Sequence, residues 1–371
     1  MPVINLHRLQ LGERIRVMVV DDSVVIRRLV SLALENDPII EVVATASNGA
    51  IGLQRIPQLN PDVITLDIEM PDMDGLEMLR RIRREFPKVR VIMFSTLTER
   101  GAAKTLEALT LGADDYVAKV SNEGSLDLSM ARLREEMIPK IKQFFFLPVE
   151  ARRVSQPAPQ SSYSALPVGS RIPVLKDTKL WPKVVLIGVS TGGPTALGSI
   201  LPTFPAGFPL PILVVQHMPP LFTRLLAERL NSTCQLPVQE ATEGNLVEGG
   251  KILIAPGDFH MKVVSSGSGA TISLDQSPRQ NSCRPAVDVL FASTAEVFGG
   301  AVLAVILTGM GQDGLRGSAI LKAQGARVIA QDEASSIVWG MPGAVVNAGL
   351  ADRVLPLDQV VSEIVRIVGR R

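Results

Sequence analysis

A serine that lies among glycines and follows an apolar run has the pattern of an enzymatic nucleophile. Residues 184–189 have the length and β-branched content of a buried strand, and Ser190 comes directly after them. Gly188, Ser190 and Gly192 match the G-x-S-x-G turn, which exposes a serine hydroxyl at the end of a strand. A glycine-rich turn can also be a plain connection, or can hold an anion through its N–H groups. The pattern alone leaves all three interpretations open.

A serine nucleophile needs a base within hydrogen-bond reach, and this chain has only three histidines. His7 lies in the N-terminal tail. His217 directly follows the apolar run 211–216, as Ser190 follows its own run, whereas His260 precedes an apolar run and is expected to enter a strand. We therefore predict His217 as the base, with a structural, hydrogen-bonded histidine as the alternative.

The third group of such a site is a carboxylate that orients the imidazole. Asp313 follows the apolar run 301–307, in a segment with glycines at positions 309, 311, 314 and 317 that permit close backbone approach and free N–H groups. Met310 is a candidate for an oxyanion hole there. Asp332 competes with Asp313, or else caps a turn before Glu333. We predict Asp313.

A second set of chemically capable residues ends the apolar runs of the first 150 residues. Asp21 and Asp22 end the first run, Asp67 the third, Ser95 the fourth and Lys119 the fifth. In a doubly wound sheet of order 2-1-3-4-5, strands 1 and 3 are neighbours, so the three carboxylates are expected to converge. Such a cluster favours a hard cation, and Mg²⁺ accepts a few carboxylates. The alternative is that strand ends are exposed and merely polar.

The elements that position these residues alternate between apolar runs and segments of helical period, which predicts α/β folds with parallel sheets. Residues 15–147 are predicted to form one domain and residues 183–371 a second, doubly wound domain with a predominantly parallel sheet. Prolines and serines in residues 148–182 predict a linker. The glycine-rich residues 265–269 predict a hairpin inserted in the second domain.

Composition agrees with two domains, since 371 residues with 46% hydrophobic and 20% charged content can bury substantial core. The net charge of +1 provides no basic field, so nucleic-acid binding is not expected. Cys234 and Cys283 are predicted to be free thiols in a reducing compartment. With no signal peptide and no apolar run of about 20 residues, we expect a cytoplasmic protein without membrane insertion.

The first domain resembles the receiver domain of two-component response regulators, which has a flavodoxin-like fold. The resemblance rests on these matches: Asp21-Asp22, Asp67 followed by Met70-Pro71-Asp72-Met73-Asp74-Gly75, Ser95-Thr96, and Tyr116 with Lys119. It implies that Asp67 accepts a phosphoryl group from a histidine kinase as a carboxylate nucleophile. Val120 departs from the pattern, because receivers usually carry proline there.

The same resemblance implies roles for the neighbouring residues. Mg²⁺ would be held by Asp21, Asp22 and Asp67, with the backbone carbonyl of Glu69. Ser95 and Tyr116 would form the phosphoryl switch, and Lys119 would pair with the phosphoryl group.

The second domain is similar to the catalytic domain of the chemotaxis receptor methylesterase family. The similarity rests on residues 187–194, 216–218, 255–257, 284–291, 308–314, 331–336 and 339–342. It implies hydrolysis of glutamate methyl esters on chemoreceptor (methyl-accepting chemotaxis protein) cytoplasmic helices, with release of methanol, and deamidation of receptor glutamines. Ser190, His217 and Asp313 would be the triad, and Thr191 and Met310 would shape the site.

No cofactor is expected for this ester chemistry, and the unphosphorylated receiver is expected to dock over the cleft. Two alternatives stay open at this point. One is a phosphorylation-dependent adaptor or phosphate sink, and the other is a small-molecule serine esterase under a receiver.

Overall fold

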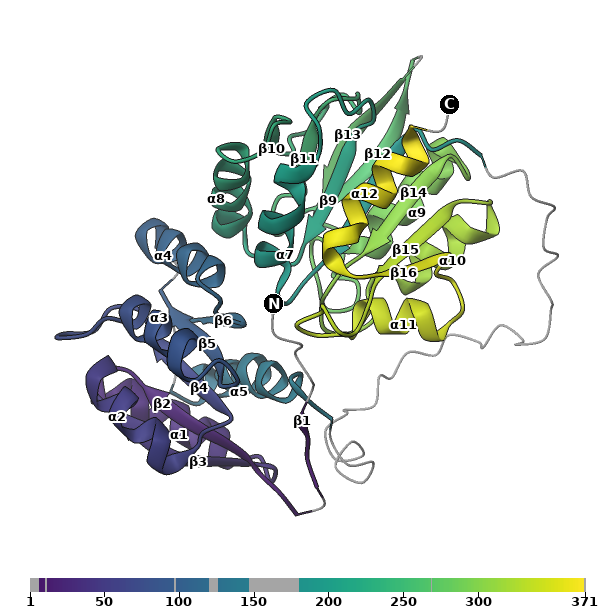
Figure 1. The fold of residues 1–371 in the computed structure, drawn as a ribbon. Coiled ribbons are helices and arrows are strands. Elements are labelled where there is room, and N and C mark those ends of the chain that lie inside the picture. Colours follow the sequence, from purple (N-terminus) through teal and green to yellow (C-terminus); the bar gives the residue numbers. More distant parts are fainter. Residues whose placement is uncertain are drawn as a thin grey trace.

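Two large parallel sheets, separate from each other, organise the described part of the chain (Figure 1). The computed structural model describes residues 7–10, 12–96, 98–119, 126–146, 180–267 and 269–369. The predicted linker, residues 148–182, lies outside the described residues except for its last three, and so does Val120. Within the described residues, no helix is both long and apolar enough to cross a membrane.

The first sheet has five strands and confirms the predicted order. Its strands are β2 (Ile15–Val20), β3 (Ile40–Ala46), β4 (Val63–Asp67), β5 (Arg90–Ser95) and β6 (Asp115–Ala118). They lie in the order β3-β2-β4-β5-β6, and every neighbouring pair is parallel. Counted along the chain, this order is 2-1-3-4-5. The central strand β4 is buried along its whole length, as expected for an apolar run covered on both faces.

Five helices cover the two faces of this sheet. They are α1 (Val24–Glu35), α2 (Gly49–Leu59), α3 (Gly75–Glu85), α4 (Glu99–Thr110) and α5 (Leu126–Lys142). Side chains of α1 and α5 share one hydrophobic cluster, and those of α2, α3 and α4 share another. Ser23, Asn48, Asp74 and Thr98 cap the first four helices by accepting a backbone N–H, which fixes where each helix begins.

The second sheet has seven strands, and all its neighbouring pairs are parallel. In spatial order they are β10 (Val238–Glu240), β11 (Ile252–Ile254), β9 (Ile212–Gln216), β8 (Val184–Val189), β14 (Val302–Ile306), β15 (Arg327–Gln331) and β16 (Arg353–Leu355). The predicted hairpin is confirmed as the antiparallel pair β12 (His260–Ser266) and β13 (Gly269–Asp275). The edge strands β10 and β16 were not predicted, because each contains polar or charged residues and is only partly buried, so neither forms an apolar run.

Helices cover both faces of this sheet, so the predicted doubly wound arrangement is confirmed. On one face lie α7 (Gly193–Ile200), α8 (Pro220–Asn231) and α12 (Leu357–Val368). The short 3-10 helix η1 (Leu201–Thr203) directly follows α7 on the same face. On the other lie α9 (Val287–Phe298), α10 (Leu315–Ala323) and α11 (Met341–Asn347), with the hairpin.

The N-terminal tail is anchored to the first domain. His7–Arg8 form a short strand, β1, that pairs in parallel with β7 (Phe145–Phe146), directly after α5. Leu9 is buried in the cluster that contains the side chains of α1 and α5. The described part of the tail is therefore structured.

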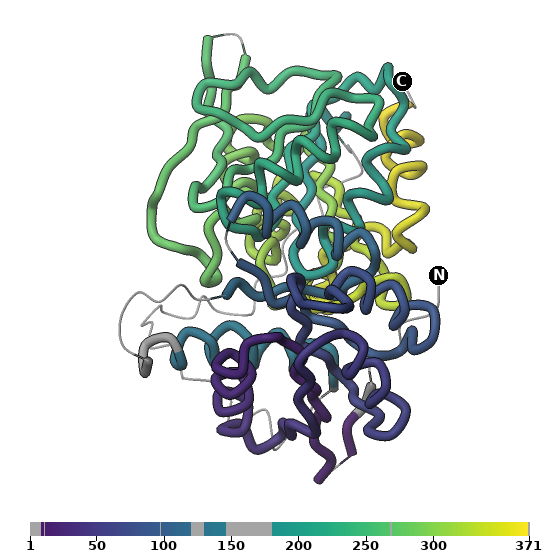
Figure 2. Tube along the Cα trace, turned by 90° about the vertical axis from the view of Figure 1, so that its left-hand side faces the viewer, coloured from purple at the N-terminus to yellow at the C-terminus, as the bar shows by residue number. Residues whose placement is uncertain are grey.

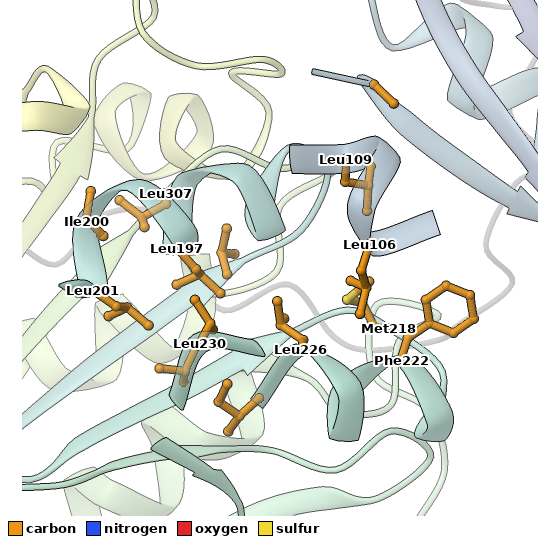
Figure 3. Close-up of a cluster of buried hydrophobic side chains, with 14 of the residues drawn as sticks. Leu106, Leu109, Leu197, Ile200, Leu201, Met218, Phe222, Leu226, Leu230 and Leu307 are labelled. Atoms are coloured by element: carbon orange, nitrogen blue, oxygen red, sulfur yellow. The ribbon is translucent and has the colours of Figure 1, made fainter. Parts of the chain in front are cut away.

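The two domains are packed against each other through α4, which lies against α7 and α8 (Figures 1 and 2). Leu106 of α4 points toward Met218 and Phe222 of the second domain (Figure 3), and Leu109 of α4 and Leu197 of α7 belong to the same hydrophobic cluster. In addition, the ring of Tyr116 stacks on that of Phe222, with ring centroids 4.7 Å apart and an angle of 12° between the planes. One hydrophobic cluster thus continues from the first domain into the second.

Replacing a leucine of this contact with a charged residue should separate the domains without unfolding either one. In Leu106→Asp, a carboxylate would be buried against apolar side chains, at a cost of several kcal/mol. We expect faster amide hydrogen exchange in α4 and α8, while β4 and β14 stay protected. Leu32→Asp is the matched control, because Leu32 is 43% exposed on α1. Unchanged exchange in α8 of Leu106→Asp would contradict the importance of this contact.

Candidate functional site

The predicted acidic residues converge at the carboxyl edge of the first sheet. Asp21 follows β2 and Asp67 ends β4, and these two strands are paired. One potential ligand atom from each of Asp21, Asp22 and Asp67 lies within 4.8 Å of the others. Lys119 Nζ lies 2.8 Å from Asp67 Oδ1 and 3.0 Å from Asp21 Oδ2. The Lys119 ammonium group thus pairs with two of the three carboxylates.

The balance of charge at this edge suits a divalent cation. Burial raises the pKa of Asp67 to about 6, and although the Lys119 ammonium opposes this shift, the nearby Asp21 carboxylate adds to it. The single positive charge of Lys119 therefore does not balance the negative charge of the three carboxylates. Oxygen ligands on a partly solvated cluster, with Asp22 exposed, match the preference of Mg²⁺ for carboxylates and retained water.

The other residues predicted for this site lie beside the carboxylates rather than among them. Ser95 Oγ accepts a hydrogen bond of 2.6 Å from Thr105 of α4 and lies 3.3 Å from the carbonyl oxygen of Gly101. The Glu69 side chain pairs with Lys104 at 2.8 Å. Tyr116 is buried in the contact between the domains, against Phe222. Ser95 thus links the acidic edge to helix α4, and Tyr116 lies in the contact between the two domains.

Ser190 lies where the sequence predicts it, one residue beyond β8. Its backbone N–H donates to the Thr308 carbonyl at 3.0 Å, which ties the turn to the segment after β14. A Cβ atom added at Gly309 would lie 2.8 Å from Ser190 Cβ, so only glycine fits beside this serine. Gly192, with φ +77°, adopts the left-handed conformation and directly precedes α7.

His217 and Asp313 form a direct pair. His217 Nε2 lies 2.8 Å from Asp313 Oδ2, and the Asp313 side chain is almost fully buried. Burial would raise the pKa of Asp313, but the hydrogen bond and charge of His217 and the N–H groups of Val287 and Asp288 lower it below its usual value. Asp313 therefore stays a carboxylate, as an orienting group requires.

The second ring nitrogen of His217 faces a sulfur atom. Cys283 Sγ lies 3.6 Å from His217 Nδ1. Burial would lower the pKa of His217, but Asp313 and Cys283 outweigh it and raise the pKa to about 10. In this arrangement the imidazole therefore holds its proton at neutral pH. Transfer of a proton from Ser190 requires the nitrogen opposite Asp313 to be free.

Ser190 and His217 line one cavity of about 360 Å³ between the two domains. The second domain contributes Ser190, Thr191, Gly192, Pro194, Gln216, His217, Asn281, Ser282, Cys283, Met310 and Gly311. The first domain contributes Leu109, Asp115, Tyr116 and Lys140. The predicted site residues Thr191 and Met310 thus lie at this cavity, with Met310 41% exposed.

A hydrogen-bonded contact closes the cavity next to Ser190. Thr191 Oγ1 lies 3.1 Å from Asp115 Oδ2 and 3.0 Å from Gln143 Oε1, and its hydroxyl donates to one of these at a time. Both acceptors belong to the first domain, and Asp115 is buried. On the same side, Thr195 Oγ1 donates to the Leu109 carbonyl at 2.8 Å. Polar groups of the first domain thus contact the turn that carries Ser190.

Several of these residues were not predicted from the sequence. Asn281 and Cys283 reach the cavity from an irregular segment before α9, and Asp115 reaches it from another domain. Their only signal was their chemical type, because none of them follows the carboxyl end of a strand, and Asp115 begins one. By contrast, Asp332 Oδ1 accepts from the N–H and the hydroxyl of Ser335, which is the turn-capping arrangement considered as its alternative role.

Comparison with known proteins agrees with this arrangement of two domains. Residues 17–130 match the response regulator receiver domain model, and residues 185–364 match the model described as CheB methylesterase. A protein-glutamate methylesterase/protein-glutamine glutaminase of Trichodesmium erythraeum is 49% identical over 96% of this chain and 99% of its own length. The chain belongs to the CheB methylesterase family.

Other CheB relatives extend the match. A protein of the same description from Nocardioides sp. is 50% identical over 96% of each chain. The crystal structure of the Thermotoga maritima CheB methylesterase catalytic domain is 46% identical, with a TM-score of 0.50, and covers 51% of this chain and 100% of its own. The resemblance to the chemotaxis receptor methylesterase family is therefore confirmed, and so is the enzyme class, a hydrolase.

Removing the sulfur atom beside His217 should shift the pH dependence of ester hydrolysis. Because Cys283 contributes to the raised pKa of His217, Cys283→Ala should lower that pKa, and the neutral imidazole should then be present at lower pH. We expect the acidic limb of the pH–rate profile to move to lower pH. Cys234→Ala, at the other free thiol, is the control. A profile of Cys283→Ala that coincides with the control would contradict this reading.

Proposed function

We propose that this chain hydrolyses glutamate methyl esters on the cytoplasmic helices of chemoreceptors, releasing methanol, and deamidates receptor glutamines. The observation that carries the proposal is a single cavity lined by Ser190 and His217, with His217 bound to Asp313 at 2.8 Å. Relatives described as protein-glutamate methylesterase/protein-glutamine glutaminase match the chain over nearly its whole length. This activity belongs to adaptation in chemotaxis-type signalling.

The proposed reaction uses only side chains and water. Ser190 Oγ attacks the ester carbon, and the imidazole nitrogen of His217 opposite Asp313 takes the hydroxyl proton. Asp313 stabilises the resulting imidazolium, which then gives the proton to the departing methoxide to form methanol. Water, deprotonated by His217, cleaves the acyl-enzyme and restores Ser190. With a glutamine, ammonia leaves in place of methanol.

Residues around the nucleophile would stabilise the tetrahedral intermediate. Met310 lies at the cavity in the segment that follows β14, and its backbone N–H is our candidate for the oxyanion hole. Thr191 would shape the site once its contact with Asp115 is released. Neither role requires a cofactor.

In the first domain, we assign Asp67 as the carboxylate that accepts a phosphoryl group from a chemotaxis-type histidine kinase. Asp21, Asp22 and Asp67, with the backbone carbonyl of Glu69, would hold Mg²⁺. That ion would neutralise charge on the transferred phosphoryl group. Lys119 already lies 2.8 Å from Asp67 and would pair with the same group.

Ser95 and Tyr116 would carry the phosphorylation signal to the contact between the domains. Ser95 is hydrogen-bonded to α4, and Tyr116 stacks on Phe222. Movement of either side chain toward the phosphoryl group would weaken the packing over the cavity. Phosphorylation would then shift the population toward an open cleft. A cytoplasmic location agrees with both proposed partners, the kinase and the receptor helices.

The nucleophile is tested by Ser190→Ala. We expect loss of methanol release from methyl-labelled receptor membranes by about 10⁴-fold or more, as for other serine hydrolases. Ser199→Ala is the matched control, since Ser199 is an exposed residue of the neighbouring helix α7. Near-normal turnover by Ser190→Ala would overturn the assignment. Hydrolysis of small esters only would favour a small-molecule esterase, and phosphorylation without any hydrolysis would favour a phosphate sink.

The regulatory contact is tested by Asp115→Ala, measured without phosphodonor. Asp115→Ala removes the charged one of the two acceptors of the Thr191 hydroxyl and leaves Gln143. A hydrogen bond to a charged group is worth about 1.5 kcal/mol, so basal methanol release should rise by up to about tenfold. Glu99→Gln is the control, because the exposed pair Glu99–Arg224 also joins the domains but contributes little. Asp67→Asn should abolish stimulation by a small phosphodonor with Mg²⁺. A basal rate in Asp115→Ala equal to that of Glu99→Gln would contradict the proposed closure.

A further inference from the structure

A second buried carboxylate lies beside Asp313 and is not explained by the proposed triad. Asp288 is only 5% exposed, and burial raises its pKa above the usual value. The Asn281 side-chain amide donates to Asp288 Oδ2 and to Asp313 Oδ1, both at 2.9 Å. Two buried carboxylates are therefore joined by one amide group.

The two aspartates also cap each other's helices. Helix α9 begins after Ala286, which has no capping side chain, and Asp313 accepts from the N–H groups of Val287 at 2.7 Å and Asp288 at 3.0 Å. Asp288 lies in the first turn of α9, and its Oδ1 accepts from the first turn of α10. The distances are 3.0 Å to Gly314 N and 2.7 Å to Gly317 N. Each carboxylate thus satisfies N–H groups that are otherwise free at a helix start.

This exchange of caps requires the helix starts to lie very close together. A Cβ atom added at Gly317 would lie 2.5 Å from Phe291 Cβ and 3.3 Å from Asp288 Cα. Gly314 adopts φ +92°, a conformation that other residues rarely take. The glycines after Asp313 therefore bring α10 within reach of Asp288.

The Asp313 carboxylate is hydrogen-bonded to several groups at once. Besides His217, Asp313 accepts hydrogen bonds from the N–H groups of Val287, Asp288 and Gly314 and from the Asn281 amide. Asp288 binds two of these donors, Gly314 and Asn281, through its own oxygens. The direction in which Asp313 faces the imidazole therefore depends on Asp288.

We propose that Asp288 is a positioning residue for the esterase reaction, which acts through Asn281 and the start of α10 to hold Asp313 toward His217. Asp288 itself does not touch the substrate or the reacting atoms. The inference rests on the proposed role of Asp313.

The test uses Asp288→Asn in the full chain, with Mg²⁺, a small phosphodonor and methyl-labelled receptor membranes. An asparagine keeps the shape, but its NH₂ group must face either the NH₂ of Asn281 or the N–H groups of α10, so one set of hydrogen bonds is lost. Because a small misplacement of an orienting group can cost up to about 100-fold, we expect kcat to fall roughly 10- to 100-fold, with KM within about twofold. Glu296→Gln, exposed on the same helix, is the control and should retain full activity.

A double-mutant cycle separates positioning from general structural damage. If Asp288 acts through Asp313, Asp288→Asn should cause less than about twofold further loss of kcat in an Asp313→Asn background. An equal loss in both backgrounds, or a near-normal kcat of Asp288→Asn alone, would overturn the inference.

If Asp288→Asn fails to fold, as judged by its thermal transition, Asn281→Gly takes its place. Glycine tolerates the φ of +51° at this position and removes only the bridging amide. The same loss of kcat, absent in the Asp313→Asn background, is expected, and a normal kcat would overturn the inference. Full activity of Asp313→Asn alone would instead overturn the proposed triad, and this inference with it.

Discussion

The parallel pairing of β8 with β9 on one side and β14 on the other is the constraint on which the proposed esterase site depends. Val189 pairs with Gln216, and Gly188 pairs with Ile306, so the three strands end at one level. The next residues continue the ladder, because Ser190 N–H donates to Thr308 and His217 N–H donates to Val189. A slip of one residue in either pairing would turn Ser190 or His217 to the other face.

The buried charges of Asp313 and His217 determine the chemistry expected at this edge of the second sheet, and they also limit it. An isolated buried carboxylate is costly, and Asp313 avoids that cost because several N–H groups and the imidazole surround it. Burial alone would lower the pKa of His217, but Asp313 and Cys283 outweigh it and raise the pKa to about 10. A protonated imidazole cannot accept the proton of Ser190. The first domain lines one side of the cavity, and the histidine is charged. These are two separate reasons to expect a low rate in the packed arrangement.

The acidic edge and the interdomain contact lie within one short part of the first domain. Ser95 ends β5 and is hydrogen-bonded to Thr105, while Leu106 and Leu109, on the same helix, pack against the second domain. Tyr116, in the neighbouring strand β6, stacks on Phe222 of the second domain. A phosphoryl group on Asp67 would therefore act within a few residues of the surface that covers Ser190. The bistable element in this proposal is the docked surface of α4 and β6.

Local sequence pattern was enough to predict the buried strands of both sheets and the residues at their carboxyl ends. Apolar runs mark buried strands, and Asp21, Asp67, Ser190 and His217 directly follow or end such runs, so local pattern was enough to find them. The edge strands β10 and β16 were missed, because their polar and charged residues break the apolar pattern. Asp115, Cys283 and Asp288 could be assigned to the site only from the folded structure. These residues reach it from another domain, from an irregular loop and from a helix start, and their roles depend on contacts between segments far apart in the chain, which no local pattern records.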